Sequence, residues 1–541
     1  MEHRSTYQPF RNPTFRNLWS ATLASNLGGL IQTVGAGWLM TSLTSQQSLV
    51  ALVQASNTLP IMVFSLIAGA LADSFNRRRI LLVAQLFMLA ASVLLAVFAW
   101  NGWLTPWTLL AFTFLIGCGT ALYNPSWQAS MGDIVSRADL PNAVSLNSMG
   151  FNMMRSVGPA IGGFIVAAGG AAMAFAANAV SYVPLIVALL VWRPVYPEET
   201  LPREPLHRAL GAGLRYVAMS PALVRVMLRG ALFGFAACAV LALMPTLARD
   251  ILKGTPVTYG IMLGAFGFGA IIGASLNGRL RARFRNESIV QGASVAFAAG
   301  LVGLGLSKIL ILSVVALLAC GIAWVMTLSL FNVSVQLATP RWVVGRALSF
   351  YQMATFGGMA TGSWVWGLSA DHWGTDRALI VAGIVLALGV LIGRWLPMAD
   401  FSDLDLDPSN RFREPALRLD LRDRSGPIMV MIDYRIAQED VGAFLAVMQD
   451  RRRIRIRDGA RQWALLRDLE NPDQWTESYH VPTWVDYIRH QQRRTKADLD
   501  VTERLLALHR GPGQPIVHRM IERQTVPLRD DMPLKPLPEV H

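Results

Sequence analysis

Long apolar stretches follow one another from Leu18 to Leu396 and are separated by short polar segments. A helix needs about 20 apolar residues to cross the hydrocarbon core of a bilayer. Counted in segments of this length, the apolar stretches predict an all-α membrane protein with twelve transmembrane helices. They are expected over residues 17–42, 48–73, 79–100, 107–130, 144–168, 172–192, 223–248, 257–279, 288–307, 309–334, 347–370 and 378–397.

One pattern of polar and small residues occurs twice in this region, about two hundred residues apart. Residues 123–128 (YNPSWQ) return as 331–336 (FNVSVQ), and residues 69–73 (GALAD) return as 273–277 (GASLN), with arginines following both. Such self-similarity indicates a duplicated architecture. We therefore expect two repeats of six helices, as in transporters whose halves rock about a central site.

Composition and charge support a membrane protein with one orientation. The 541 residues are 53% hydrophobic and 15% charged, which excludes a soluble enzyme of this length. The net charge of +13 could indicate a nucleic-acid partner, but the arginines lie in loops between the predicted spans. Loops at 77–79, 193–215 and 279–285 are rich in arginine, so the positive-inside rule places them and both termini in the cytoplasm.

Metal, cofactor and nucleotide sites are not predicted. Cys118, Cys238 and Cys320 lie inside apolar stretches without a partner at metal-ligand spacing, so they indicate neither a disulfide nor a zinc site. The sequence contains no loop of the G-x-x-x-x-G-K-[ST] kind, which argues against direct drive by ATP.

Two local motifs stand out, one with charged residues, a turn residue and a glycine, and one with glycines and a proline. The first runs from Gly69 through Asp73 and Asn76 to Arg77, Arg78 and Arg79, and the second is Gly158, Pro159, Gly162 and Gly163. The first resembles the signature between spans 2 and 3 of the major facilitator superfamily, and the second resembles the span 5 signature of its antiporter branch. The resemblance covers residues 15–400 and points to bacterial exporters related to the enterobactin exporter and macrolide efflux pumps. It implies alternating access and export of a small organic molecule across the bacterial cytoplasmic membrane, usually against protons.

The first motif can act as a conformational latch. A carboxylate at the cytoplasmic end of span 2, followed by three arginines, can form an ion pair across the interface between bundles in one state and lose it in another. Asn76 stands where the family usually has glycine, and we expect it to keep a left-handed turn. The second repeat has Asn277 in place of the acid, which predicts a latch charged only in the first half. Alternatively, the arginines only set the topology.

The second motif predicts a bend in span 5 or its close packing against a neighbouring helix, because the glycines remove side chains from one face and Pro159 loosens a backbone hydrogen bond. Arg155 precedes it, near mid-membrane, and Asn152 lies on roughly the same face. An arginine at this depth is costly unless it faces a polar cavity or a partner. We expect Arg155 to bind an anionic or polar group of the substrate, and the alternative is a structural arginine bonded to carbonyls of a neighbouring helix.

Other polar residues inside spans are candidates for a substrate pathway, as a group. They are Asn26, Gln32, Asn57, Asn124, Gln128, Asn332, Gln336, Tyr351 and Gln352. Buried amides also join helices to one another, which is the alternative for each one. No Asp, Glu or His lies at mid-span, and the candidate acids Asp73, Asp133 and Asp371 are near helix ends. Proton coupling is therefore implied by the family resemblance alone.

The last 140 residues or so read as soluble. Strands are expected at 428–436, 463–467, 474–481 and 515–522, with helices at 438–453 and 482–510, which suggests a cytoplasmic ferredoxin-like α+β domain. Trp463, Arg467, Pro472, Trp475, Glu477 and His490 resemble the pattern of dimeric α+β barrels of the antibiotic-biosynthesis monooxygenase type. A regulatory, substrate-sensing or homodimer-forming role stays open, and enzymatic activity is not predicted. The basic run 451–457 fits either contact with anionic lipid or a solvated helix end.

The predicted organisation runs as follows: an N-terminal bundle over 1–192, a linker over 193–222, a second bundle over 223–399, a charged linker over 400–426, the α+β domain over 427–524 and a disordered tail over 525–541. The predicted function is secondary export of a small organic molecule such as a drug or siderophore, with the lipid bilayer and protons as the other partners. Import, lipid flipping, and a membrane-held enzyme or sensor are the alternatives.

The latch hypothesis predicts that the neutral substitution Asp73→Asn lowers transport without preventing insertion, because the carboxylate is needed to bias the two states. Transport by this variant is compared with wild type at equal amounts of protein in the membrane. Normal transport by Asp73→Asn would remove the latch.

Overall fold

A computed structural model describes residues 8–136, 139–194, 206–340, 342–398 and 406–522, apart from positions 408, 410, 411, 413, 416 and 423. The predicted disordered tail lies outside these residues. The chain divides into two compact units. Unit 1 comprises 1–206, 224–335 and 348–400, and unit 2 comprises 207–223, 336–347 and 401–541. Residues 207–222 of the predicted linker, residue 223 and the connection at 336–347 thus group with the C-terminal segment.

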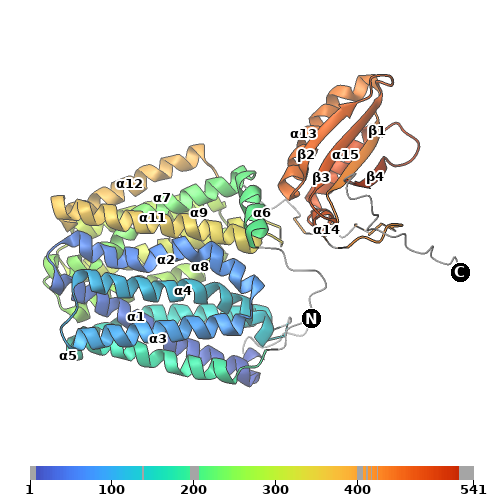
Figure 1. The fold of residues 1–541 in the computed structure, drawn as a ribbon. Coiled ribbons are helices and arrows are strands. Elements are labelled where there is room, and N and C mark those ends of the chain that lie inside the picture. Colours follow the sequence, from blue (N-terminus) through green and yellow to red (C-terminus); the bar gives the residue numbers. More distant parts are fainter. Residues whose placement is uncertain are drawn as a thin grey trace. The chain divides into compact units, whose positions relative to one another are not determined.

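Unit 1 is built of long helices (Figure 1). Its helices are α1 (Pro13–Leu43), α2 (Gln47–Ser74), α3 (Arg77–Trp100), α4 (Pro106–Ile134), α5 (Leu140–Val191), α7 (Pro221–Thr246), α8 (Pro256–Arg281), α9 (Asn286–Leu306), α10 (Leu310–Leu337), α11 (Val344–Trp373) and α12 (Thr375–Trp395), with short helical turns at Gln8–Arg11 and Leu247–Ile251. Within the described part of the chain, nine helices are long and apolar enough to cross a membrane. The prediction of a mainly helical membrane protein is confirmed.

The helices lie where the apolar pattern predicts them, and no expected end departs by more than four residues. The predicted break between residues 168 and 172 falls inside α5, where Gly170 has a φ of 74° and a non-helical conformation. This positive φ is accessible to glycine because it has no Cβ atom. Gly170 therefore divides α5 into two helical segments.

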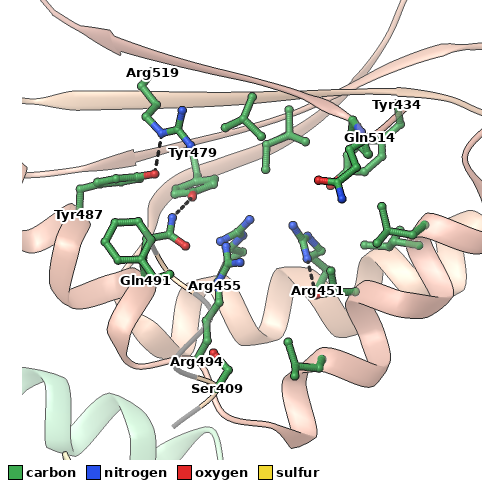
Figure 2. A pocket seen from close by; sticks show the side chains of 18 residues that line it. Ser409, Tyr434, Arg451, Arg455, Tyr479, Tyr487, Gln491, Arg494, Gln514 and Arg519 are labelled. Atoms are coloured by element: carbon green, nitrogen blue, oxygen red, sulfur yellow. Dashed lines mark hydrogen bonds between the residues drawn. The ribbon is translucent and has the colours of Figure 1, made fainter. Parts of the chain in front are cut away.

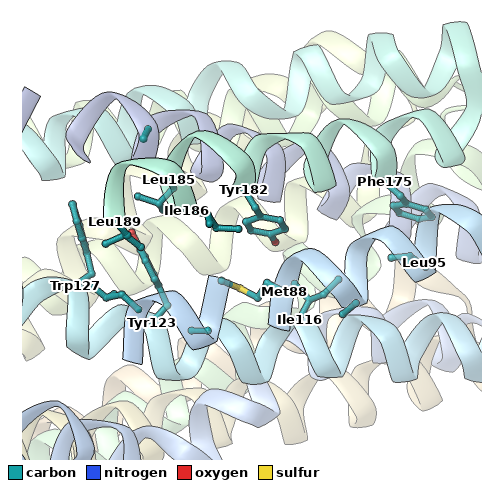
Figure 3. Close-up of a cluster of buried hydrophobic side chains, with 14 of the residues drawn as sticks. Met88, Leu95, Ile116, Tyr123, Trp127, Phe175, Tyr182, Leu185, Ile186 and Leu189 are labelled. Atoms are coloured by element: carbon teal, nitrogen blue, oxygen red, sulfur yellow. The ribbon is translucent and has the colours of Figure 1, made fainter. Parts of the chain in front are cut away.

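A buried apolar cluster holds the first five helices together (Figure 3). In this cluster the rings of Tyr123 and Trp127 from α4 stack with centroids 6.0 Å apart, beside Leu189 of α5. Large apolar side chains such as Val83 of α3 and Val180 of α5 are more than 60% exposed in the protein alone. Such exposure is expected of helices that present one face to lipid, because lipid is as apolar as the core.

Unit 2 contains α6 (Leu206–Ala218) and a four-stranded antiparallel sheet in the order β2-β3-β1-β4. The strands are β1 (Ile428–Arg435), β2 (Arg461–Arg467), β3 (Gln474–Val481) and β4 (Ile516–Ile521), and the helices among them are η3 (Gln438–Asp440), α13 (Val441–Asp458), α14 (Trp484–Gln492) and α15 (Ala497–Leu508). Alternate residues of β1 are buried, as the period of two predicts. All four strands lie where alternation in the sequence predicts them.

Glu477 of β3 organises the interior of this sheet and its helices. Its side chain is fully buried, and each carboxylate oxygen accepts two hydrogen bonds. Arg451 and Tyr434 donate to Oε2 over 3.0 and 3.1 Å, and Arg455 and Trp463 donate to Oε1 over 3.0 and 3.2 Å. Burial by itself raises the pKa of Glu477, but the two guanidinium groups outweigh it and hold that pKa well below its usual range.

This network corrects the prediction for the basic run at 451–457. Arg451 and Arg455 lie four residues apart on one face of α13, and both are buried against Glu477. Arg452 and Arg453 are the exposed members of the run. Neither lipid contact nor a solvated helix end describes Arg451 and Arg455, because both side chains are buried. The carboxylate of Glu477, from a distant strand, offsets the cost of burying their charges.

We predict that Glu477→Gln destabilises unit 2 by about 3 kcal/mol, because it leaves two buried guanidinium groups without a charge partner. Hydrogen exchange of the β1 and β3 amides in the full-length protein measures this cost. The folded-state pKa of Glu477 is depressed, so its contribution is present above an unfolded pKa of about 4.3 and is lost as the pH falls below it. Glu470→Gln, in the exposed turn before β3, is the matched control and should leave exchange unchanged. Equal exchange in both variants would contradict the assignment.

Candidate functional site

Helices α5 and α8, from different predicted repeats, pack backbone against backbone. A Cβ atom at Gly163 would lie 2.7 Å from the carbonyl oxygen of Pro256, and one at Gly260 would lie 2.5 Å from that of Pro159. These separations leave no room for a side chain on either helix. The predicted tight contact at the span 5 motif is thus confirmed.

The other two glycines of the motif face a different helix. A Cβ atom at Gly158 would lie 3.0 Å from Cβ of Leu30, and one at Gly162 would lie 3.0 Å from Cα of Ile31, both in α1. The motif therefore serves two neighbours, α1 and α8, rather than one.

Arg155 lies at one end of the α5–α8 contact, beyond Gly163 and Gly260. A Cβ atom at Gly267 of α8 would lie 2.3 Å from the carbonyl oxygen of Arg155, so the two backbones touch at this point. The Arg155 side chain is half-buried, and its guanidinium carbon lies 5.5 Å from the ring centroid of Phe266. Among the described residues, no carboxylate forms an ion pair with Arg155. An aromatic face gives a cation modest stabilisation and leaves its hydrogen-bond donors available.

Arg229 of α7 is a second arginine within an apolar helix, and sequence reasoning did not single it out. Its guanidinium binds both oxygens of Glu287, at the start of α9, over 2.6 and 3.0 Å, and it donates to the carbonyl of Leu396 over 3.2 Å. This bidentate pair joins three helices. Because the partners are 58 residues apart, no local spacing in the sequence reveals it. Among the residues that the structure describes, a carboxylate pairs with Arg229 and none pairs with Arg155.

The other predicted pathway residues are scattered over different environments. Gln32 is buried, and its side-chain oxygen accepts hydrogen bonds from Ser92 of α3 and Asn178 of α5. The helix-joining alternative describes this residue. Tyr351 is also buried, and its hydroxyl donates to the carbonyl of Leu328 in α10 over 3.3 Å.

The remaining candidates differ in exposure. Asn57 and Asn152 donate to carbonyls one turn earlier in their own helices, over 3.2 and 2.9 Å. Asn26, Asn332 and Gln352 are half-buried. Asn124, Gln128 and Gln336 are exposed at the surface of the protein.

The predicted latch arginines bind within the first half of unit 1. Arg77 pairs with Asp133 of α4 over 3.0 Å, and Arg78 donates to the carbonyls of Leu189 and Leu190 at the end of α5, each over 2.7 Å. Two of the three arginines therefore join helices of one half. The side chain of Asp73 lies outside the described part of the structure. In the second half, Asn277 donates to Ser329 of α10 over 2.9 Å.

Asn76 does not form the left-handed turn that we expected. Its φ of −63° and ψ of 110° are extended, and its side chain accepts a hydrogen bond from the Arg79 amide over 3.2 Å. Asn76 is thus the N-cap of α3. The asparagine side chain accepts a hydrogen bond from an otherwise unpaired amide of the first helical turn. Glycine, which the family usually has here, has no side chain that could accept it.

A second contact between the two predicted halves joins α2 and α11. Asp371, near the end of α11, accepts hydrogen bonds from the backbone amides of Gln47 and Ser48 over 2.6 and 3.1 Å. At the other end of the pair, Ser65 donates to the carbonyl of Ser349 over 3.4 Å. The carboxylate satisfies free amides at the start of α2 and complements the positive end of its dipole.

Comparison with known proteins adds to this geometry. The family model described as transmembrane secretion effector matches residues 4–525. Over 370 residues the chain is 24% identical to the staphyloferrin A transporter of Staphylococcus aureus (strain NCTC 8325 / PS 47), covering 68% of this chain and 92% of that protein. Over 313 residues it is 27% identical to the enterobactin exporter EntS of Escherichia coli O1:K1 / APEC, covering 55% of this chain and 71% of that protein.

A solved structure shares the fold. The chain matches a bacterial homolog to the human lysosomal transporter Spinster, in an inward-facing and unoccupied conformation, with a TM-score of 0.58 and 14% identity. The match covers 72% of this chain and 97% of that chain. At this identity the likeness shows the arrangement of the helices alone.

We predict that Gly267→Ala forces α5 and α8 apart and lowers the free energy of unfolding by about 1–3 kcal/mol, because the new methyl group meets a backbone carbonyl. The unfolding temperature of the purified protein in detergent micelles measures this effect. Gly278→Ala, also in α8, has no atom within 4 Å of the new methyl group and is the matched control. Alanine is a better helix former than glycine by about 1 kcal/mol, so the control should be neutral or stabilised. Equal shifts for both variants would contradict the close contact.

Proposed function

The chain belongs to the transmembrane secretion effector family of the major facilitator superfamily, and on that premise we propose that it exports a small organic molecule by alternating access. Proteins of this kind are secondary transporters and not enzymes. Two similar proteins named for export or transport of siderophores, the staphyloferrin A transporter and the enterobactin exporter, support a substrate of small organic character.

The observation that carries the proposal is the half-buried Arg155 at the contact between the two halves. A charge at this depth is costly without a partner. No described carboxylate supplies one, and the α5–α8 contact brings the guanidinium to the boundary along which the halves would move. We assign Arg155 to recognition of an anionic or polar group of the substrate, with Asn152 beside it.

Twelve spans in two six-helix repeats form the proposed transport unit. The two segments of α5 on either side of Gly170 count as two spans, and the less apolar α1 and α11 complete the set.

The positive-inside rule supports cytoplasmic termini. The topology β1-α13-β2-β3-α14-α15-β4 supports a ferredoxin-like fold for the C-terminal domain.

Opening of the halves must break the contacts of Asp371 with the start of α2. Protonation would weaken this carboxylate as an acceptor and reduce its attraction to the helix dipole. We therefore assign Asp371 as the candidate group through which a proton gradient drives the cycle. The Asp73 latch remains a second proposed device of the same kind.

The test compares the compounds retained by cells that express wild-type protein, Arg155→Ala or no protein, with the proton gradient intact and collapsed. A transported compound should accumulate in cells without the protein and fall in cells with it. Arg155→Ala should reduce export about tenfold or more, because it removes a charged hydrogen-bond donor worth about 1.5–3 kcal/mol. Asp371→Asn should export at a rate that no longer depends on the gradient.

Arg249→Ala is the matched control, since Arg249 is exposed near the outer end of α7 and should leave export unchanged. All variants are compared at equal amounts in the membrane. Retention that rises with expression would identify an importer instead. A change confined to lipid distribution would identify a flippase. Full export by Arg155→Ala would remove that residue from the pathway.

A further inference from the structure

A cavity of about 470 Å³ lies in unit 2 between the sheet and its helices (Figure 2). Residues from β1, β3 and β4 line one wall, and residues from α13, α14 and α15 line the other. Pockets for small organic molecules span roughly 300–1,000 Å³, so the size is suitable for one ligand. Neither the transport proposal nor the resemblance to exporters bears on this cavity.

The cavity carries an excess of positive charge. Four arginines line it: Arg451, Arg455, Arg494 and Arg519. Glu477 pairs with the first two, and within the described residues no other carboxylate pairs with any of the four. Arg519 instead donates to the hydroxyl of Tyr487 over 2.7 Å. Burial and the charges of Arg455 and Arg451 lower the pKa of Arg494 to about 10, as expected where positive charge is not neutralised.

Arg455 has a hydrogen-bond donor without a partner. The residue is 1% exposed, and its Nη2 atom makes no hydrogen bond within the described part of the chain. Its other terminal nitrogen, Nη1, lies 3.2 Å from Nε2 of His490, which burial and the Arg455 charge keep neutral by lowering its pKa. A buried charged donor left unsatisfied costs more than about 1–3 kcal/mol. A ligand oxygen in the cavity would remove that cost.

The rest of the wall is aromatic and apolar. Tyr434, Tyr479 and Tyr487 line it together with Ile432, Val517 and Leu505. The guanidinium carbon of Arg455 lies 4.5 Å from the ring centroid of Tyr479, so charge and aromatic surface are adjacent. Figure 2 shows Arg451 and Arg455 pointing from α13 into the space below the sheet. This combination favours a ligand with an acidic group at one end and a flat apolar body at the other.

We propose that unit 2 binds a small organic carboxylate with an aromatic or otherwise planar body in this cavity. The carboxylate lies among Arg455, Arg494 and Arg519, where guanidinium groups offer paired donors that match its two oxygens. The body packs against the three tyrosines. The site is independent of the transport pathway and is tested by binding alone.

The experiment uses the full-length protein in detergent micelles and isothermal titration calorimetry with 1-naphthoate as the probe. Saturable binding with one site per chain is expected. The neutral analogue 1-naphthamide should bind at least tenfold more weakly. Arg494→Gln should weaken naphthoate binding about tenfold, since a hydrogen bond to a charged group contributes about 1.5–3 kcal/mol. Arg519→Gln, on the β4 side of the cavity, should do the same.

Arg452→Gln is the matched control. Arg452 lies on α13 beside the lining arginines, is exposed, and packs over Trp463 instead of the cavity, so naphthoate binding should be unchanged. Hydrogen exchange of β1 and β3 checks that each variant is folded. Absence of saturable naphthoate binding at millimolar concentrations would overturn the proposal. So would equal binding of naphthamide, equal weakening by Arg452→Gln, or inorganic phosphate binding as tightly as naphthoate, which would show an anion site without an organic ligand.

Discussion

The backbone contact between α5 and α8 is the constraint on which unit 1 depends. Lipid offers no hydrophobic drive for helices to associate, so close packing has to supply the attraction. Glycines at 163, 260 and 267 permit it by removing side chains where the carbonyls of the opposing helix lie. The same closeness sets the position of Arg155, because its own carbonyl forms part of the contact. A substitution that separates α5 from α8 at Gly267 therefore also displaces the backbone of Arg155.

Two arginines in apolar helices, Arg229 and Arg155, differ in whether a described carboxylate pairs with them. Arg229 is held by both oxygens of Glu287, which offsets the cost of removing a guanidinium from water. The guanidinium of Arg155 instead lies against the ring of Phe266, at the contact between the two predicted halves. Both lie in apolar helices and look alike in sequence. They differ in the group that pairs with the guanidinium. Such a group can belong to the protein itself or to a bound molecule.

The same reasoning applies within unit 2. Glu477 neutralises part of an arginine cluster and fixes Arg451 and Arg455 in place. One carboxylate cannot neutralise four guanidinium groups, so the cavity beside it keeps a positive field. Glu477 thus stabilises the fold and prepares the adjacent space for an anion. The residue was noticed in sequence as part of a family pattern, but its role follows from the two arginines that converge on it.

The sequence alone determined the helix positions, the break between residues 168 and 172, the four strands and the glycine contact of span 5. These features depend on bilayer thickness, on the periods of helix and strand and on small residues at fixed spacing, all of which are local properties. Tertiary structure alone decided which charges are paired. Glu287 and Glu477 lie 58 and 22 or more residues from their arginines, and the amide of Gln32 meets partners on two other helices. Such pairings form only when packing brings distant segments together and excludes water, so no spacing along the chain encodes them.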